Sequence, residues 1–159
     1  MKKLKKEKFI GFDTETKPTF KKGVKNLNKV ALLQLSTLTD AFLFRINKIG
    51  LPEKLIKILT DKSVLKIGVA IDDDIKTLNK ISKFKAQGFV DLSKFSEIFD
   101  IEANGLKKLV AIVLESRISK SQQLSNWESE KLTLPQEIYA STDAWTSLLI
   151  YNKLNSIQI

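Results

Sequence analysis

Cysteine and histidine are both absent from this chain of 159 residues. Without cysteine there is no disulfide, no Cys-ligated zinc or iron–sulfur cluster and no cysteine nucleophile. Without histidine there is no Ser-His-Asp triad, no imidazole metal ligand and no histidine general base. Metal or acid–base chemistry must therefore use Asp, Glu, Tyr or Lys, and oxygen ligands favour hard cations such as Mg²⁺ and Mn²⁺.

Long apolar runs are absent too, and none of the runs could cross a bilayer. A lysine-rich start is followed by an apolar stretch of residues 9–12 only, which is too short for the apolar core of a secretory signal. Together with the lack of cysteine, this predicts a cytoplasmic protein that contacts no membrane. The length predicts one compact domain over residues 1–159.

Positive charge is abundant, whereas arginine is scarce. The net charge is +9, and residues 1–30 alone hold ten lysines against three acids. Lysines beside carboxylates suit an enzyme that processes a polyanion, although genomic base bias also produces lysine-rich surfaces. Arg45 and Arg117 are the only arginines, and base-specific reading usually depends on arginine. If nucleic acid is the partner, we therefore expect backbone contacts without sequence specificity.

The hydrophobic pattern predicts strands first and then strands alternating with helices. The expected strands are residues 9–12, 30–36, 41–46, 64–69 and 89–90. The expected helices begin at Pro52, run from 72 to 81, cover 106–115 after a cap at Asn104, and run from Thr133 to about 155. Thr133 and Gln136 form an expected capping box. This order predicts an α/β domain with a mixed central β-sheet flanked by α-helices.

Two acids follow the first expected strand in the segment Phe12-Asp13-Thr14-Glu15. If the strand continues to Glu15, both carboxylates project from one face, with Cα atoms about 7 Å apart. Side chains at that spacing can converge on one cation. Taken alone, an Asp-x-Glu pair is weak, and two solvated turn residues are the simpler interpretation.

Further acids lie on two of the expected helices. Asp72, Asp73 and Asp74 open a helix, where one aspartate commonly caps the first turn; a cap does not need three, which leaves room for a cation. On the last helix, Tyr139 and Asp143 are four residues apart and share a face. Asp143 lies among apolar residues, so it is either turned outward or paired with another group or a metal.

Together the three clusters resemble the DEDD superfamily of 3′→5′ exonucleases, in the branch that has a tyrosine in its last motif. The resemblance is strongest to the exonuclease domain of the Werner-syndrome protein and to ribonuclease D, and it covers residues 9–154. The spacing from Gly68 selects Asp74 over Asp72 and Asp73. The matching segments are Asp13-Thr14-Glu15, residues 30–35, residues 68–78, Ser125-Asn126-Trp127 and Tyr139-x-x-x-Asp143.

The resemblance implies a ribonuclease H-like fold and hydrolysis of phosphodiester bonds from the 3′ end of DNA or RNA, with release of nucleoside 5′-monophosphates. It implies two divalent cations, Mg²⁺ or Mn²⁺, held by Asp13, Glu15, Asp74 and Asp143. Asp13 would bridge both cations. Glu15 and Asp143 would hold the cation that activates water, and Asp74 would hold the second. Tyr139 would orient the attacking water.

Two other functions stay open. A catalytically silent nucleic-acid-binding module of the same fold would not need all four acids and Tyr139. A phosphatase or sugar-nucleotide transferase could use an acidic strand end, but it has no evident use for the pair of Tyr139 and Asp143. Phe20, Lys120 and Trp127 are candidate substrate contacts, although packing for Phe20, solvation for Lys120 and loop pinning for Trp127 are simpler roles.

Overall fold

The computed structural model describes residues 3–18, 29–103 and 105–157. Within these residues one mixed sheet has the strand order β3-β2-β1-β4-β5. β1 pairs antiparallel with β2 and parallel with β4, which confirms the predicted mixed sheet. The strands are β1 (Phe9–Thr16), β2 (Val30–Ser36), β3 (Ala41–Phe44), β4 (Leu65–Gly68) and β5 (Phe89–Asp91).

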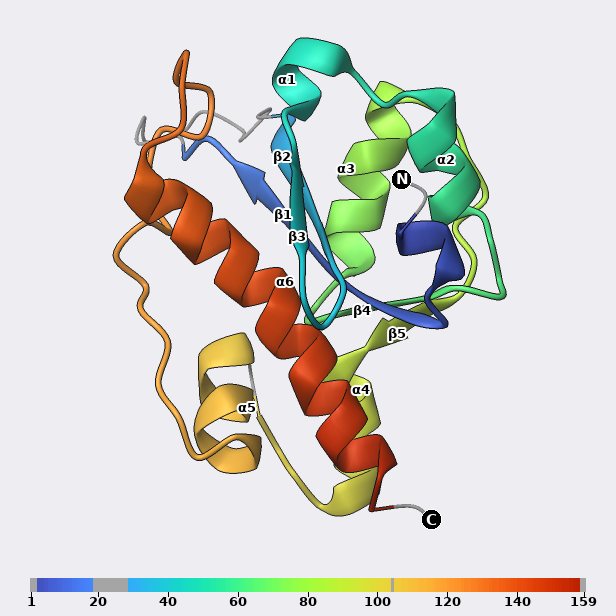
Figure 1. The fold of residues 1–159 in the computed structure, drawn as a ribbon, viewed down its shortest axis with the longest axis vertical. Helices are drawn as coiled ribbons and strands as arrows, with labels where there is room; N and C mark the ends of the chain where they lie inside the picture. Colours follow the sequence, from blue (N-terminus) through green and yellow to red (C-terminus); the bar gives the residue numbers. More distant parts are fainter. Residues whose placement is uncertain (1–2, 19–28, 104, 158–159) are drawn as a thin grey trace.

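Helices cover both faces of the sheet, with α6 crossing one face diagonally beside α5, and with α2 and α3 side by side on the other (Figure 1). The α-helices are α1 (Ile46–Ile49), α2 (Glu53–Leu59), α3 (Asp72–Ile81), α4 (Leu92–Phe95), α5 (Leu106–Val113) and α6 (Leu134–Asn155). Two 3₁₀ helices are η1 (Leu4–Lys6) and η2 (Ser96–Phe99). Leu33 and Leu35 of β2 pack with the α2 and α3 layer. Leu32 packs with Ala140 on the α6 side.

Gly11 lets α6 approach β1 more closely than any side chain would allow. A Cβ atom at Gly11 would lie 1.9 Å from the backbone oxygen of Ala144 and 2.3 Å from the hydroxyl oxygen of Ser36. Real Cβ atoms do not approach other atoms so closely, so the contact requires glycine. Asp143 directly precedes Ala144 on α6. The close crossing therefore places Asp143 over β1, the strand that carries Asp13.

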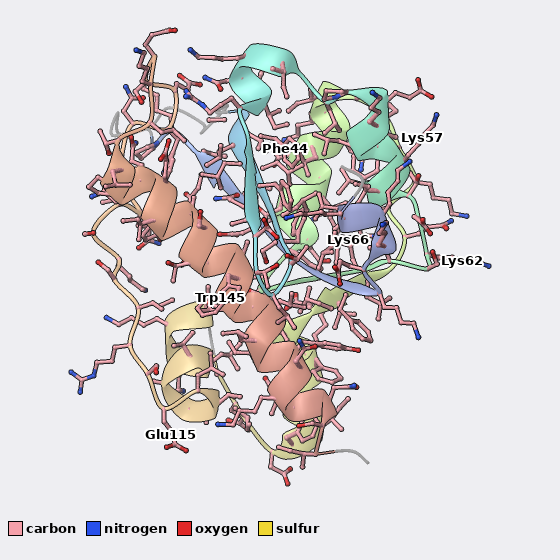
Figure 2. All side chains as sticks on the ribbon, in the orientation of Figure 1. Phe44, Lys57, Lys62, Lys66, Glu115 and Trp145 are labelled. Carbon is pink, nitrogen blue, oxygen red and sulfur yellow. The ribbon has the colours of Figure 1, made fainter. Side chains whose placement is uncertain are left out.

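Trp145 ties the outer side of α6 to the turn between β2 and β3. Its indole Nε1 donates a hydrogen bond of 3.0 Å to the backbone oxygen of Leu38. The side chain lies on the surface of α6, where Figure 2 labels it. This bond and the Gly11 contact fix the position of α6 across the sheet.

Most of the predicted elements are confirmed, although β1 runs on to Thr16 where the pattern predicted residues 9–12, and three further differences follow. The strand predicted over 41–46 ends at Phe44, because Ile46 already starts α1. An aspartate cap on α3 was the wrong expectation: the cap position is Ile71, and no side chain caps the helix. The short helices α1 and α4 and the two 3₁₀ helices are additional. The capping box of Thr133 and Gln136 is confirmed, whereas Asn104 and Phe20 lie outside the described residues.

Among the helices that the structure describes, none combines the length and the apolar character needed to pass through a membrane.

Candidate active site

Asp13 and Glu15 project from the same face of β1, as the spacing predicted. β1 runs on to Thr16 and pairs with β2 through both acidic positions, so these residues belong to the strand and not to a turn. One carboxylate oxygen from each lies within 4.8 Å of the other and of an oxygen of Asp143. Three carboxylates from β1 and α6, distant in sequence, therefore share one small volume.

Asp143 points inward, which overturns the reading of it as a solvated helix residue. Its side chain belongs to the buried part of α6, with the residue only 8% exposed. Tyr139 lies one helical turn earlier, half-buried, and its hydroxyl lies close enough to the Asp143 carboxyl to lower the pKa of that acid. The ring of Tyr139 lies 5.9 Å from that of Trp127, which is fully buried and therefore pins the loop before α6.

Asp74 lies at the edge of the three-acid group. It is in the first turn of α3, and its carboxylate accepts a hydrogen bond of 2.5 Å from the Thr14 hydroxyl. The Asp74 charge raises the pKa of both Asp13 and Glu15, so its field reaches the cluster. Asp72 and Asp73 are exposed instead. Of the three neighbouring aspartates, Asp74 is the one whose side chain lies beside the cluster.

All four carboxyl groups hold protons more tightly than free acids do. Burial raises the pKa of Glu15 to about 9, with added repulsion from Asp13, Asp143 and Asp74. Burial raises the pKa of Asp13 well above its usual value, and the charges of Asp143 and Asp74 add to this. Burial also raises the pKa of Asp74 and of Asp143 to about 6. The cluster is strained by its own negative charge, which a bound cation would relieve.

The acids lie in a cavity of about 620 Å³ whose wall mixes charge and apolar surface. Lys107, Lys108 and Lys120 line it together with Asp13, Glu15, Tyr139 and Asp143. The charge of Lys120 lowers the pKa of Asp143, so this lysine lies within electrostatic reach of the cluster. Val69, Leu106 and Ile118 add apolar surface. The cavity thus offers positive charge for anionic groups together with some apolar surface.

The sequence missed Thr14, Lys107 and Lys108 as cavity residues. Thr14 stands inside the first motif, and a hydroxyl between two acids was a signal for a hydrogen bond to a third. The two α5 lysines look like ordinary surface residues in the sequence. Only the packing of α5 beside α6 brings them to the cavity, and that packing depends on contacts distant in the chain.

The donor set fits divalent cations. Three carboxylates converge within 4.8 Å, and a fourth acid stands beside them. Carboxylate oxygens without nitrogen or sulfur ligands suit small hard cations that keep part of their water shell. The raised pKa values support the same conclusion, because a bound cation would relieve the repulsion among these acids.

Comparison with known proteins gives the family. A sequence model of the 3′-5′ exonuclease family matches residues 1–158. A protein of Acanthamoeba polyphaga mimivirus that is named as a 3′-5′ exonuclease is 37% identical, over 94% of this chain and 40% of that protein. The bifunctional 3′-5′ exonuclease and ATP-dependent helicase WRN of Mus musculus is 34% identical, over 93% of this chain and 11% of its own. The chain thus spans less than half the length of either relative.

Solved structures give the same fold. The exonuclease domain of Nibbler from Aedes aegypti aligns with a TM-score of 0.82 and 29% identity, over 99% of this chain and 84% of that one. Ribonuclease D of Trypanosoma brucei aligns with a TM-score of 0.81 and 21% identity, over 95% of this chain and 56% of that one. These likenesses confirm the ribonuclease H-like fold. Together with the matched residues 1–158, they show that the chain belongs to the 3′-5′ exonuclease family of the DEDD superfamily.

Proposed function

We propose that this chain is a metal-dependent 3′-5′ exonuclease of the tyrosine branch, which hydrolyses the terminal phosphodiester bond of DNA or RNA and releases nucleoside 5′-monophosphates. One observation carries the proposal: Asp13, Glu15 and Asp143, from β1 and α6, place carboxylate oxygens within 4.8 Å of one another. Membership of the 3′-5′ exonuclease family supplies the reaction class. We also propose that residues 1–159 form one domain and that its location is cytoplasmic.

The acids divide the metal-binding work. Two divalent cations, Mg²⁺ or Mn²⁺, would lower the pKa of a bound water and stabilise the leaving 3′ oxygen. Asp13 would contact both cations, because it shares the group with Glu15 and Asp143 and also senses the charge of Asp74. Glu15 and Asp143 would hold the cation that activates the attacking water. Asp74 would hold the second, with its carboxylate kept in place by the Thr14 hydroxyl.

Tyr139 orients the attacking water rather than removing its proton. Burial and the charge of Asp143 raise the pKa of the Tyr139 hydroxyl above its ordinary value. The phenol therefore stays neutral at any physiological pH and makes a poor base. A neutral hydroxyl beside Asp143 can still fix a water by hydrogen bonding, and fixed geometry accelerates attack.

Lysine side chains supply the contacts to the phosphates of the nucleic-acid strand. Lys107, Lys108 and Lys120 line the same cavity as the acids, where they can neutralise phosphates without reading bases. Of the two arginines, Arg45 donates to the backbone oxygen of Ser129 and is committed to the fold. We therefore expect the protein to contact the sugar-phosphate backbone of the strand without reading its sequence. The ribonuclease D of Trypanosoma brucei was solved in complex with RNA, which supports a nucleic-acid strand as the ligand of this cavity.

The test is a digestion of 5′-labelled strands. Matched DNA and RNA, single- and double-stranded, are incubated with Mg²⁺, Mn²⁺ or chelator, and products are resolved by length. We expect a ladder that shortens one nucleotide at a time from the 3′ end, only with a divalent cation. The preferred substrate is the one whose ladder shortens fastest.

Asp13→Ala serves as the catalytic control in the same digestion. Wild-type digestion no faster than that of the variant would favour a silent nucleic-acid-binding module. Release of inorganic phosphate from a monoester, with intact strands, would favour a phosphatase. Either result would overturn the exonuclease assignment.

A further inference from the structure

The Gln34 side chain on β2 is buried completely and makes no hydrogen bond. Its exposed fraction is 0%, and neither the amide nitrogen nor the amide oxygen has a partner. An amide offers two donors and an acceptor, and leaving such atoms buried and unpaired costs about 1–3 kcal/mol. A leucine would fill this position without that cost. Unpaired buried amides are rare enough that their neighbours need inspection.

The register of the sheet places Gln34 directly beside a proposed metal ligand. Gln34 is the cross-strand partner of Asp13 in the antiparallel pair of β1 and β2. Directly opposed residues project from the same face, with Cβ atoms about 4.5–5.5 Å apart. Asp13 faces α6, because its carboxylate meets that of Asp143. The Gln34 side chain therefore starts on the same face and within one side-chain length of the Asp13 carboxylate.

Helix α6 closes over this position. Leu32, two residues before Gln34, packs with Ala140. Ser36, two residues after Gln34, lies beside Gly11 at the point where the Ala144 backbone oxygen of α6 comes close to β1. Residues two apart on a strand share a face, so Gln34 lies beneath the helical turn that carries Asp143. Water has no open route to the amide, since Gln34 is 0% exposed.

We propose that Gln34 is a positioning residue for the metal site: its Nε2 donates a hydrogen bond to the Asp13 carboxylate and fixes that carboxylate toward the cations. The inference rests on the proposed function. The terminal torsion of glutamine is broad, so a rotation of the amide is enough to make the bond. Ligating carboxylates are commonly held by such neighbours, whose loss costs roughly 10–100-fold in metal affinity.

The test separates metal affinity from stability. Gln34→Met keeps the length and bulk of the side chain but removes both donors. Mn²⁺ binding to the metal-free protein is measured by calorimetry, and thermal unfolding is followed without metal. We expect the Mn²⁺ dissociation constant to rise roughly 10–100-fold, while the melting temperature without metal stays equal or rises. A merely structural amide would not produce this split. Gln34→Leu serves the same purpose if the methionine variant does not fold.

Ser36→Ala is the matched control. Ser36 lies on the same strand and face, and its buried hydroxyl is also unpaired, but its cross-strand partner is Gly11 and not an acid. We expect this variant to bind Mn²⁺ as the wild type does. Equal Mn²⁺ affinity in the wild type and Gln34→Met, or an equal loss in Ser36→Ala, would overturn the proposal.

Failure of the proposed function gives a different result. In that case the wild type itself binds no Mn²⁺, or Asp13→Asn binds it as well as the wild type does. If the wild type binds Mn²⁺, Asp13→Asn does not and Gln34→Met matches the wild type, only the positioning role is wrong.

Discussion

At Asp13, the need to bind a metal conflicts with the stability of the metal-free fold. The Asp13 carboxylate shares one group with those of Glu15 and Asp143, and burial together with the charges of Asp143 and Asp74 raises its pKa strongly. Without a cation the fold therefore tolerates an acid that its surroundings disfavour. Residues kept at such a cost are commonly functional.

Replacing Asp13 with asparagine should abolish activity and stabilise the metal-free fold. Loss of a bridging ligand removes several kcal/mol of transition-state stabilisation, or at least about 1,000-fold in turnover. Removing the buried acid should raise the free energy of unfolding by roughly 1 kcal/mol. Turnover of labelled strands and denaturant unfolding with chelator measure the two effects. Asp72→Asn, at an exposed acid of α3, should change neither. A metal-free Asp13→Asn protein less stable than the wild type would contradict this account of the cluster.

Tyr139→Phe should slow turnover while leaving strand binding intact. The ring still packs near Trp127, but the hydroxyl that meets Asp143 is gone. We expect kcat to fall roughly 100-fold, the scale on which misplacement of a reacting group slows a reaction, with the Kd for a strand within about threefold of the wild-type value. Tyr151→Phe, in the core packed against α5, is the control and should keep full turnover. Unchanged turnover in Tyr139→Phe would remove the hydroxyl from the mechanism.

At the scale of elements, the site depends on where α6 crosses β1. Gly11→Ala should drive a Cβ into the Ala144 backbone oxygen, at 1.9 Å if nothing moves. Overpacking of this kind costs about 1–3 kcal/mol, and the helix must shift outward with Asp143. We expect a lower free energy of unfolding in urea together with weaker Mn²⁺ binding. Thr142→Ala, on the same helix but away from the crossing, is the control. Wild-type Mn²⁺ affinity in Gly11→Ala would show that the crossing does not set the site.

Elements and site differ in how far the sequence predicts them. β2, α3 and α6 match their predicted bounds, because apolar periodicity and the Thr133 capping box define them locally. The end of β3 was missed, because residues 41–44 and Ile46 are apolar, and a single arginine, Arg45, marks the turn into α1. The acids were found through their motif spacing. Their convergence, the Thr14 bond to Asp74 and the α5 lysines depend on long-range packing, which local patterns do not encode.

For the whole molecule, the acid cluster makes the stability of the metal-free protein depend on pH. Glu15, with a pKa near 9, together with Asp74 and Asp143, near 6, binds protons more tightly when folded than when unfolded. Such groups stabilise the fold fully below their unfolded pKa values, and the benefit is lost as pH rises through the folded ones. We therefore expect the metal-free protein to be less stable at pH 8 than at pH 6, by roughly 1–2 kcal/mol.

Thermal unfolding with chelator at the two pH values measures this dependence. Saturating Mn²⁺ should reduce it, because cation-bound carboxylates are ionised in the folded state at both pH values. The same melting curves of Asp13→Asn should also show a weaker dependence, since one repelling charge is gone. A metal-free wild type that gains stability between pH 6 and pH 8 would contradict the assigned burial of these acids.

The most direct measurement is the anomalous scattering of Mn²⁺ in crystals of the wild type soaked with a nucleoside 5′-monophosphate. The account predicts two Mn²⁺ peaks that share Asp13, one also bound by Glu15 and Asp143 and the other on the side of Asp74. Crystals that show clear nucleotide density but no Mn²⁺ among these carboxylates would contradict it.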